Sequence, residues 1–498
     1  MKPQRSFLNS IKWAYAANWG ERAFSALFTF ILAALLGPRD FGLISIALSY
    51  ILFLQMFLDQ GLAAALIQKN DLKQEHLDAV FWMDLALSFF LFLASVVFSG
   101  WWARLNHAPD AAPIIAVISV SIIIEALSVV QKSLLRRQMD FKSLAMRTNI
   151  SVLVSGVVGI GMAFGGFRVW ALVGQQIARD FVALVLLWTL SPWRPRLKFS
   201  WGPLRDLMGF SVPNFAAQLA NFAEGQAGPV VIGLLFGPLA LGLFRLASRF
   251  VNCVVVVASS SIQAVSLPEF SRLQDHPAEL RTSALSCVRL SSTVALPALA
   301  GLAAVSDPLM SVLGPEWAPA SNVLKVLSVA GMFIIFAYFT GPLLQALART
   351  HQLAILEWAR TVVGILLLTV AGFVVRGGSV NAQIMAISLA SLATSAIIVA
   401  PVYLYILMRL ANLSLRDLTA SVLPSVAAAA TVASSAILFQ SFRASVGLRP
   451  TAQLAAEAIV GFLAGGAALL TFDSHLRAVA TRSFAKTFWE RQVATSQD

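Results

Sequence analysis

The stretch ALLGPRDFGLISIA, residues 34–47, recurs 200 positions later as LLFGPLALGLFRLA, residues 234–247. Six positions are identical at that offset, among them the Gly-Pro pair and the glycine four residues after the proline. Apolar residues flank the Gly-Pro pair on both sides, and proline cannot continue the helix that precedes it. The pattern predicts one helix ending and another beginning, and its recurrence indicates an internal duplication.

The composition indicates the class of protein that carries this duplication. Of the 498 residues, 58% are hydrophobic and 12% are charged, and the mean hydropathy is +0.78. An ordinary soluble domain is about 45–50% apolar and about 25% charged. We therefore expect an all-α polytopic membrane protein. The basic residues stand in short segments between apolar runs, so membrane topology accounts for them and no nucleic acid partner is expected.

Apolar segments long enough to cross a bilayer set the predicted topology, since a spanning helix needs about 20 mostly apolar residues. About fourteen segments qualify, at residues 13–36, 41–67, 79–102, 111–135, 148–167, 169–190, 207–236, 239–267, 285–306, 319–347, 353–375, 380–408, 417–440 and 451–472. The first copy of the repeat connects spans one and two, and the second connects spans seven and eight. The helices of both copies therefore cross the membrane in the same direction. This predicts two parallel six-helix bundles followed by two additional C-terminal helices.

These spans divide the chain into five predicted regions. They are an N-terminal six-helix bundle at 1–190, a cytoplasmic linker at 191–206, a C-terminal six-helix bundle at 207–408, two additional transmembrane helices at 409–472 and a basic cytoplasmic tail at 473–498. With the N-terminus placed inside, 25 Lys and Arg residues lie on the inner side and 6 on the outer side. Because basic residues favour the cytoplasmic side, both termini are expected in the cytoplasm.

The short loops leave no room for an extramembrane catalytic domain. Neither a phosphate-binding G-x-x-x-x-G-K-[ST] motif nor a nucleophile–base or paired-carboxylate arrangement stands out. Cys253 and Cys287 are too few for a metal cluster, and the five histidines show no ligand spacing. The sequence therefore predicts a transporter rather than an enzyme, with no catalytic residue, metal or cofactor.

Charged and polar residues inside the predicted spans are the strongest functional signal, because a charge in a bilayer is costly unless it faces protein or water. Arg245 and Arg249, four residues apart, share one helical face. The candidate residues for binding an anionic substrate are Arg22, Arg179, Arg245 and Arg249. The candidate polar or ion-coupling residues are Asn18, Glu21, Glu125, Gln175, Gln176, Gln218, Asn221, Glu224 and Asn252. The alternative is structural, with Glu21 and Arg22 neutralising neighbours across the bundle and Arg179 pairing with Asp180.

Three longer stretches resemble a known family. They are NWGERAFSALFTFILAALLGPRDFG at 18–42, DQGLAAALIQKNDLKQEHLDAVFW at 59–82 and LLRRQMDFKSLAMR at 134–147. All three are similar to the Wzx-type polysaccharide transport branch of the multidrug/oligosaccharidyl-lipid/polysaccharide (MOP) exporter superfamily. The resemblance implies two bundles around a central cavity that opens alternately to the two sides of the membrane.

The same resemblance implies a substrate and partners. Members of the family move undecaprenyl-diphosphate-linked oligosaccharide repeat units across the bacterial inner membrane for exopolysaccharide, capsule or O-antigen (lipopolysaccharide) biosynthesis. Arg22 in the first span and Arg245 or Arg249 in the eighth then correspond to cavity arginines that bind the diphosphate. Membrane lipids, a polysaccharide polymerase and an export complex are the partners that the resemblance implies.

Two other functions compete with this one. A multidrug or cation antiporter of the same superfamily needs an acidic and aromatic cavity, whereas four arginines lie deep in the predicted spans. A membrane polysaccharide polymerase or ligase usually needs a sizeable outer loop, and the outer loops here are short. The arginines within the predicted spans therefore favour a transporter of an anionic substrate over these two alternatives.

Overall fold

A computed structural model describes residues 20–58, 62–69, 71–443 and 449–472, with no side-chain detail for residues 64, 68, 206–221, 223, 224, 261, 264, 350, 442 and 443. The regular elements of this described part are all helices. They form two compact units, one comprising Met1–Leu246 with Leu368–Ile384 and the other Ala247–Leu367 with Met385–Asp498. The all-α class expected from the sequence is confirmed, whereas the five regions predicted above stay predictions.

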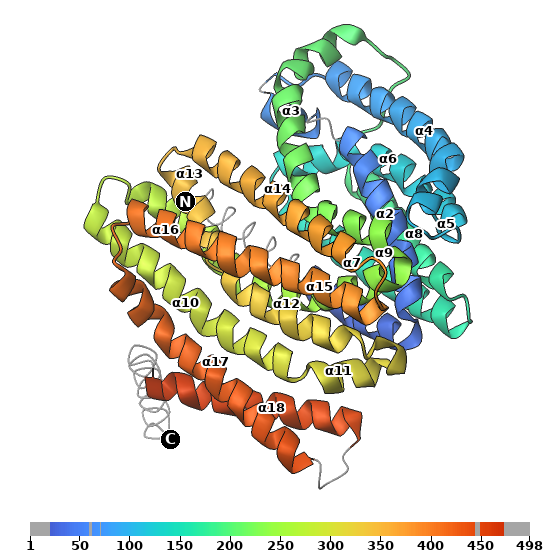
Figure 1. Ribbon diagram of the computed structural model, residues 1–498. Helices are drawn as coiled ribbons and strands as arrows, with labels where there is room; N and C mark the ends of the chain where they lie inside the picture. The colour runs from blue at the N-terminus through green and yellow to red at the C-terminus, as the bar shows by residue number, and fades with distance from the viewer. Residues whose placement is uncertain (1–19, 59–61, 70, 444–448, 473–498) are drawn as a thin grey trace, which may run out of the picture. The chain divides into compact units, whose positions relative to one another are not determined.

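The first unit carries the N-terminal helices. A helix at residues 20–35 is followed by α2 (Pro38–Leu58), α3 (Leu62–Gln68), α4 (Gln74–Leu105), α5 (Ala111–Ile118), α6 (Val120–Arg137), α7 (Phe141–Phe164), α8 (Val169–Leu190) and the first part of α9 (Trp201–Arg272) (Figure 1). Helix α7 packs along α8, and α6 contacts α3, α4 and α8. The end of α6 is therefore surrounded by other helices of the unit.

The two copies of the repeat cross each other inside this unit. Helix α2 begins at Pro38, and α9 is interrupted at Gly237, whose φ of +76° suits glycine far better than other residues. Gly42 lies against the carbonyl oxygen of Pro238, and Gly242 lies against that of Pro38. A β-carbon at either glycine would overlap the facing oxygen. The repeated stretch thus builds a reciprocal crossing in which small residues let two helix backbones approach closely.

The described residues contain fewer spanning helices than the fourteen expected from the whole sequence. Twelve helices among the described residues are long and apolar enough to cross a membrane. The first expected span is described only from residue 20, and the expected seventh and eighth spans are the two helices that meet at the Gly237 kink within α9. The polytopic architecture is confirmed, and the exact count stays a prediction.

The second unit holds the remaining helices. After the end of α9 come α10 (Pro277–Ala304), α11 (Ser306–Leu313), a 3₁₀ turn (Pro315–Trp317), α12 (Ala320–Ile334), α13 (Ala337–Ala346), α14 (Thr350–Val374), α15 (Val380–Ala393), a π-helical stretch (Thr394–Val399), α16 (Ala400–Leu410), α17 (Leu415–Arg443) and α18 (Pro450–Phe472). Short parts of α14 and α15 belong to the first unit. Helix α17 packs between α10 and α18 (Figure 1).

The segment after α8 folds back onto the first turns of α4. The indole Nε1 of Trp193 donates to Gln74 Oε1 at 3.0 Å, and its ring centroid lies 5.6 Å from that of Phe81. The backbone N–H of Arg196 donates to Asp78 Oδ1 at 3.0 Å. Trp193 is 9% exposed, so this side chain of the expected cytoplasmic linker belongs to the core of the first unit.

We expect Trp193→Ala to lower the free energy of unfolding by about 3 kcal/mol, the cost typical of truncating a buried tryptophan. Thermal unfolding of the purified protein in detergent, followed by size-exclusion chromatography after heating, measures the change. Trp201→Ala is the matched control, because it removes the same side chain from a position that is 73% exposed. Equal unfolding temperatures for the two variants would contradict the assignment of Trp193 to the core.

Candidate functional site: two charged cavities in the first unit

The larger cavity has a volume of about 510 Å³ and lies among the helix at 20–35, α6, α7 and α8. Its charged and polar lining residues are Glu21, Lys132, Arg136, Arg147, Thr148, Ser151, Gln176, Arg179 and Asp180. Four of these side chains are basic and two are acidic. The cavity therefore has a cationic wall within a unit made of apolar helices.

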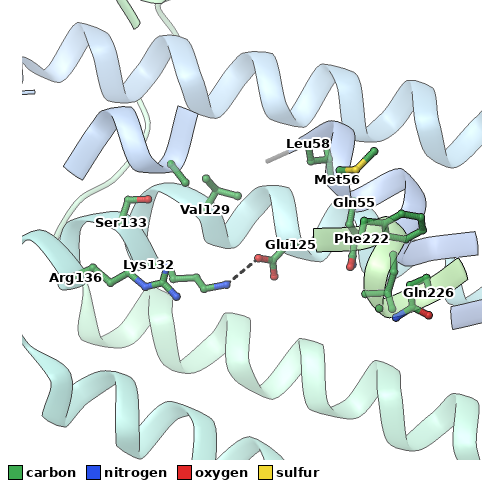
Figure 2. Close-up of a pocket in the computed structure, with 13 residues that line it drawn as sticks. Gln55, Met56, Leu58, Glu125, Val129, Lys132, Ser133, Arg136, Phe222 and Gln226 are labelled. Atoms are coloured by element: carbon green, nitrogen blue, oxygen red, sulfur yellow. Dashed lines mark hydrogen bonds and ion pairs between the residues drawn. The ribbon is translucent and has the colours of Figure 1, made fainter. Parts of the chain in front are cut away.

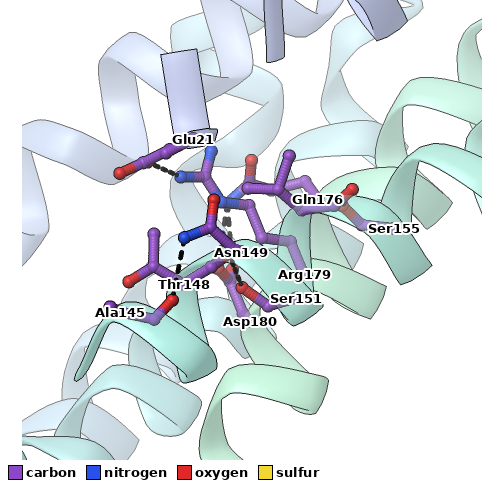
Figure 3. A network of polar contacts seen from close by, with 10 residues as sticks. Glu21, Ala145, Thr148, Asn149, Ser151, Ser155, Gln176, Arg179 and Asp180 are labelled. Carbon is purple, nitrogen blue, oxygen red and sulfur yellow. Dashed lines mark hydrogen bonds and ion pairs between the residues drawn. The ribbon is translucent and has the colours of Figure 1, made fainter. Parts of the chain in front are cut away.

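The acidic side chains of this cavity have partners within the protein. The guanidinium of Arg179 in α8 forms an ion pair with Glu21 of the helix at 20–35 (Figure 3). The next residue of α8, Asp180, accepts hydrogen bonds at 3.0 and 3.1 Å from Nε2 of Gln176, which lies one turn earlier. The structure therefore brings together Glu21 and Arg179, two residues that the sequence had marked as candidates.

Arg147 brings a buried and incompletely hydrogen-bonded guanidinium to the larger cavity. It lies about two turns into α7, after the Asp140 carboxylate has capped the helix by accepting from the Ser143 N–H at 3.1 Å. The Nε atom of Arg147 is buried and has no hydrogen-bond partner among the described residues. Because buried donors in proteins are nearly always paired, this group is suited to an acceptor that enters the cavity.

The smaller cavity has a volume of about 390 Å³ and is bordered by α2, α3, α6 and α9 (Figure 2). Its polar lining residues are Gln55, Glu125, Lys132, Ser133, Arg136 and Gln226, with Phe222 among the apolar ones. The Nζ of Lys132 lies 3.1 Å from Glu125 Oε1. Lys132 and Arg136, one turn apart on α6, line both cavities, so the two cavities meet at the end of this helix.

Arg245 does not line the smaller cavity but contacts a residue that does. Its guanidinium donates to Gln226 Oε1 at 2.8 Å and to Ser49 Oγ of α2 at 3.2 Å. The equivalent residue of the first repeat, Ser45, instead donates to the carbonyl of Phe41 in its own helix at 2.6 Å. Because the second repeat has an arginine where the first has Ser45, it provides a cation that holds the side-chain amide of Gln226 at the cavity wall.

The other candidate residues lie elsewhere. Gln175 packs on Gly159 of α7, and Arg22 is exposed and lines neither cavity. Arg249 and Asn252 are exposed on the part of α9 that belongs to the second unit. Asn18 is outside the described residues, as are the side chains of Gln218, Asn221 and Glu224. The roles given to these residues stay predictions.

Sequence reasoning missed Lys132, Arg136, Arg147 and Gln226. The three basic residues had been counted among the inner-side charges that set the topology. In the structure α6 extends to Arg137 and α7 begins at Phe141, so all three stand on helices. The spacing of Glu125, Lys132 and Arg136, at i, i+7 and i+11, places them on one helical face and was the available signal.

An all-helical, polytopic chain with a charged cavity among its apolar helices has the features of a membrane transporter. The sequence profile of a family described as "Polysaccharide biosynthesis protein" matches residues 31–322. The chain belongs to this family. The succinoglycan biosynthesis transport protein ExoT of Rhizobium meliloti (strain 1021) is 31% identical over 328 residues, which are 66% of this chain and 66% of ExoT, just under two thirds of its length.

Two solved structures share the fold. The lipid II flippase MurJ in an inward closed conformation aligns with 94% of this chain and 99% of its own, at a TM-score of 0.72 and 14% identity. An inward-facing multidrug resistance MATE family transporter of the MOP superfamily aligns with 80% of this chain and 98% of its own, at a TM-score of 0.60 and 16% identity. The resemblance to a polysaccharide transport family noted in the sequence is confirmed by the profile match, and these two structures show a shared fold.

Proposed function

We propose that this protein moves undecaprenyl-diphosphate-linked oligosaccharide repeat units from the cytoplasmic to the periplasmic leaflet of the bacterial inner membrane by alternating access. The observation that supports this most directly is the group of basic residues at the larger cavity, Lys132, Arg136, Arg147 and Arg179. A diphosphate carries only acceptor oxygens, and the planar fork of an arginine matches them with paired N–H groups. Membership of a polysaccharide biosynthesis family supports the sugar part of the substrate.

The charge balance of the cavities agrees with an anionic substrate. Glu21 pairs with Arg179 and Glu125 with Lys132, so these carboxylates neutralise part of the basic wall when no substrate is bound. A diphosphate can replace the carboxylates as the partner of these cations and bind Arg147 as well. Exchange of one anionic partner for another lowers the desolvation cost of moving a strongly hydrated headgroup into the protein.

The smaller cavity suits the sugar next to the diphosphate. Its amide side chains, Gln55 and Gln226, can both donate to and accept from sugar hydroxyls, and Phe222 offers an apolar ring face. Its volume of about 390 Å³ is within the size of small-ligand pockets. Arg22, Arg249, Asn252, Asn18, Gln175 and Glu224 stay candidates for further contacts, and Glu21, Glu125 and Glu224 for coupling to an ion.

The location of the basic residues suggests where the substrate enters. Lys132 and Arg136 lie at the end of α6 and Arg147 near the start of α7, at the boundary that the Lys and Arg distribution assigns to the cytoplasm. With both termini cytoplasmic, the headgroup would enter from the inner leaflet while the polyprenyl tail stays in lipid. A polymerase and an export complex would then use the repeat unit on the periplasmic side.

A multidrug or cation antiporter is the second candidate, because the fold is also that of a MATE transporter. A cation site needs carboxylates that are available to the substrate. Glu21, Glu125 and Asp180 instead contact Arg179, Lys132 and Gln176, respectively. These contacts favour the anionic substrate over the cation.

Translocation of the lipid-linked repeat unit tests the proposal. We expect a strain without this protein to accumulate the repeat unit in the cytoplasmic leaflet. When that strain is given the double variant Lys132→Gln plus Arg136→Gln, translocation should be at least about tenfold slower than with the wild-type protein. Arg104→Gln plus Lys142→Gln makes the same chemical change at exposed positions outside both cavities. Unpolymerised units in the periplasmic leaflet of the null strain would indicate a polymerase or ligase and contradict transport.

A further inference from the structure

A separate cationic cavity lies in the second unit, between α10 and α17. Its volume is about 520 Å³, and its polar lining residues are Arg281, Thr282, Ser286 and Arg289 of α10 with Ser421 of α17. None of these residues lines the two cavities of the first unit. The transport proposal does not use this cavity.

Two arginines line this cavity from positions two turns apart on α10. Arg281 and Arg289 are eight residues apart on one stripe of α10, a rise of about 12 Å. Side chains on a helix lean towards its N-terminus, so both arginines are expected to lean towards the start of α10. Both guanidinium groups therefore point to the boundary at which α10 begins.

That boundary corresponds to the headgroup layer of the membrane. Helix α10 has 28 residues, a length of about 42 Å that matches a bilayer including its headgroups, about 40–45 Å. Arg281 stands in the second turn of the helix, about 6 Å from its start. The distribution of Lys and Arg assigns this end to the cytoplasmic leaflet, where basic residues meet anionic lipids.

Arg281 is held in place by the start of α17. Its guanidinium donates to Asp417 Oδ2 at 2.6 Å, and the same oxygen accepts from the N–H and hydroxyl of Ser414 at 2.9 and 2.7 Å. Ser414 and Asp417 have the spacing of a capping box at the beginning of a helix. The carboxylate is thus fixed, and Arg281 keeps further N–H groups for a second acceptor.

The hydroxyl groups of the cavity complete the site. Thr282 and Ser286 donate to carbonyls of their own helix at 3.1 and 2.9 Å, so their oxygens remain acceptors for a ligand hydroxyl. Further along the same two helices, exposed apolar side chains continue into the expected lipid region. They are Leu290 and Val294 of α10 with Leu423 and Val426 of α17.

We propose that this cavity binds the phosphodiester of an anionic phospholipid with a hydroxylated headgroup, such as phosphatidylglycerol, in the cytoplasmic leaflet. The phosphate lies between Arg281 and Arg289, the headgroup hydroxyls meet Thr282, Ser286 and Ser421, and the acyl chains follow the apolar sides of α10 and α17.

The purified full-length protein in detergent tests this proposal. We measure lipid binding by native mass spectrometry and by the rise in unfolding temperature on titration with phosphatidylglycerol, phosphatidylcholine or inorganic phosphate. We expect phosphatidylglycerol to bind and stabilise more strongly than the other two. Arg281→Gln and Arg289→Gln should each weaken its binding roughly fivefold, the contribution typical of one basic residue near an anionic lipid.

Two control variants distinguish binding at this site from non-specific attraction of anionic lipid and from a purely structural role of the two arginines. Arg416→Gln removes an exposed arginine at the start of α17 that does not line the cavity, and its lipid affinity should be unchanged. Asp417→Asn keeps both arginines and removes the competing carboxylate, so affinity should be retained or increased. Arg289→Gln leaves the Arg281–Asp417 ion pair intact and provides the test even where loss of that pair impairs folding.

Each result that would contradict the proposal points to a different cause. Equal affinity in wild type and Arg289→Gln, or an equal loss in Arg416→Gln, would overturn the assigned site. A loss in Asp417→Asn as large as that in the arginine variants would assign these residues a structural role. Stabilisation by inorganic phosphate as strong as that by phosphatidylglycerol would show a soluble anion, rather than a lipid, to be the ligand.

Discussion

Arg147→Gln is expected to reduce translocation of the lipid-linked repeat unit by about 10- to 100-fold, the value of a hydrogen bond to a charged group. The Nε of Arg147 is buried at the larger cavity without a hydrogen-bond partner among the described residues. Loss of this Nε–H therefore leaves no described acceptor unpaired, and we expect the amount of folded protein to be retained. The rate is measured as the fraction of repeat units that becomes accessible in the opposite leaflet of membrane vesicles.

Two further variants show whether charge or geometry is responsible. Arg147→Lys keeps the charge but loses the planar fork, so we expect a rate between those of wild type and Arg147→Gln. Arg39→Gln is the matched control, because Arg39 is 62% exposed, pairs with Asp110 at 2.7 Å and lies outside both cavities. Wild-type translocation by Arg147→Gln, or loss of its folded protein, would contradict a role in binding substrate.

The class of fold could be predicted from the sequence because its signals are local and repeated. Apolar runs of spanning length mark the helices, and the Gly-Pro pairs mark the breaks between them. The break predicted at the second Gly-Pro pair is present, because the non-helical backbone of Gly237 separates two helices within the run α9.

The site could be predicted only in part, because the pairing of charges is a property of packing. Glu21 and Arg179 were each marked as costly residues in a span, yet they are 158 positions apart and their ion pair depends on how α8 meets the first helix. Lys132, Arg136 and Arg147 were assigned to the inner boundary. Their position at helix ends fits the predicted topology, but it gives no indication that they line a cavity.

The crossing of the two repeats should be the part of the fold least tolerant of change, and Gly242→Val should remove most of the folded protein. A valine at Gly242 would overlap the carbonyl oxygen of Pro38, and one at Gly42 would overlap that of Pro238. Backbone atoms cannot move aside as a flexible side chain can, so the two helices would have to separate. We expect a cost of about 3 kcal/mol or more, the upper part of the range for overpacking.

The yield of monodisperse protein on size-exclusion chromatography measures this effect. Gly161→Val is the matched control, because it makes the same substitution within spanning helix α7, where an added β-carbon meets no atom within 4 Å. Gly42→Val should behave like Gly242→Val, since the two contacts are reciprocal. If both variants fold and transport as Gly161→Val does, the close approach at the crossing is not needed. If only one of them fails, the two contacts are not equivalent, and the duplicated Gly-Pro-x-x-x-Gly stretch has separate roles in its two copies.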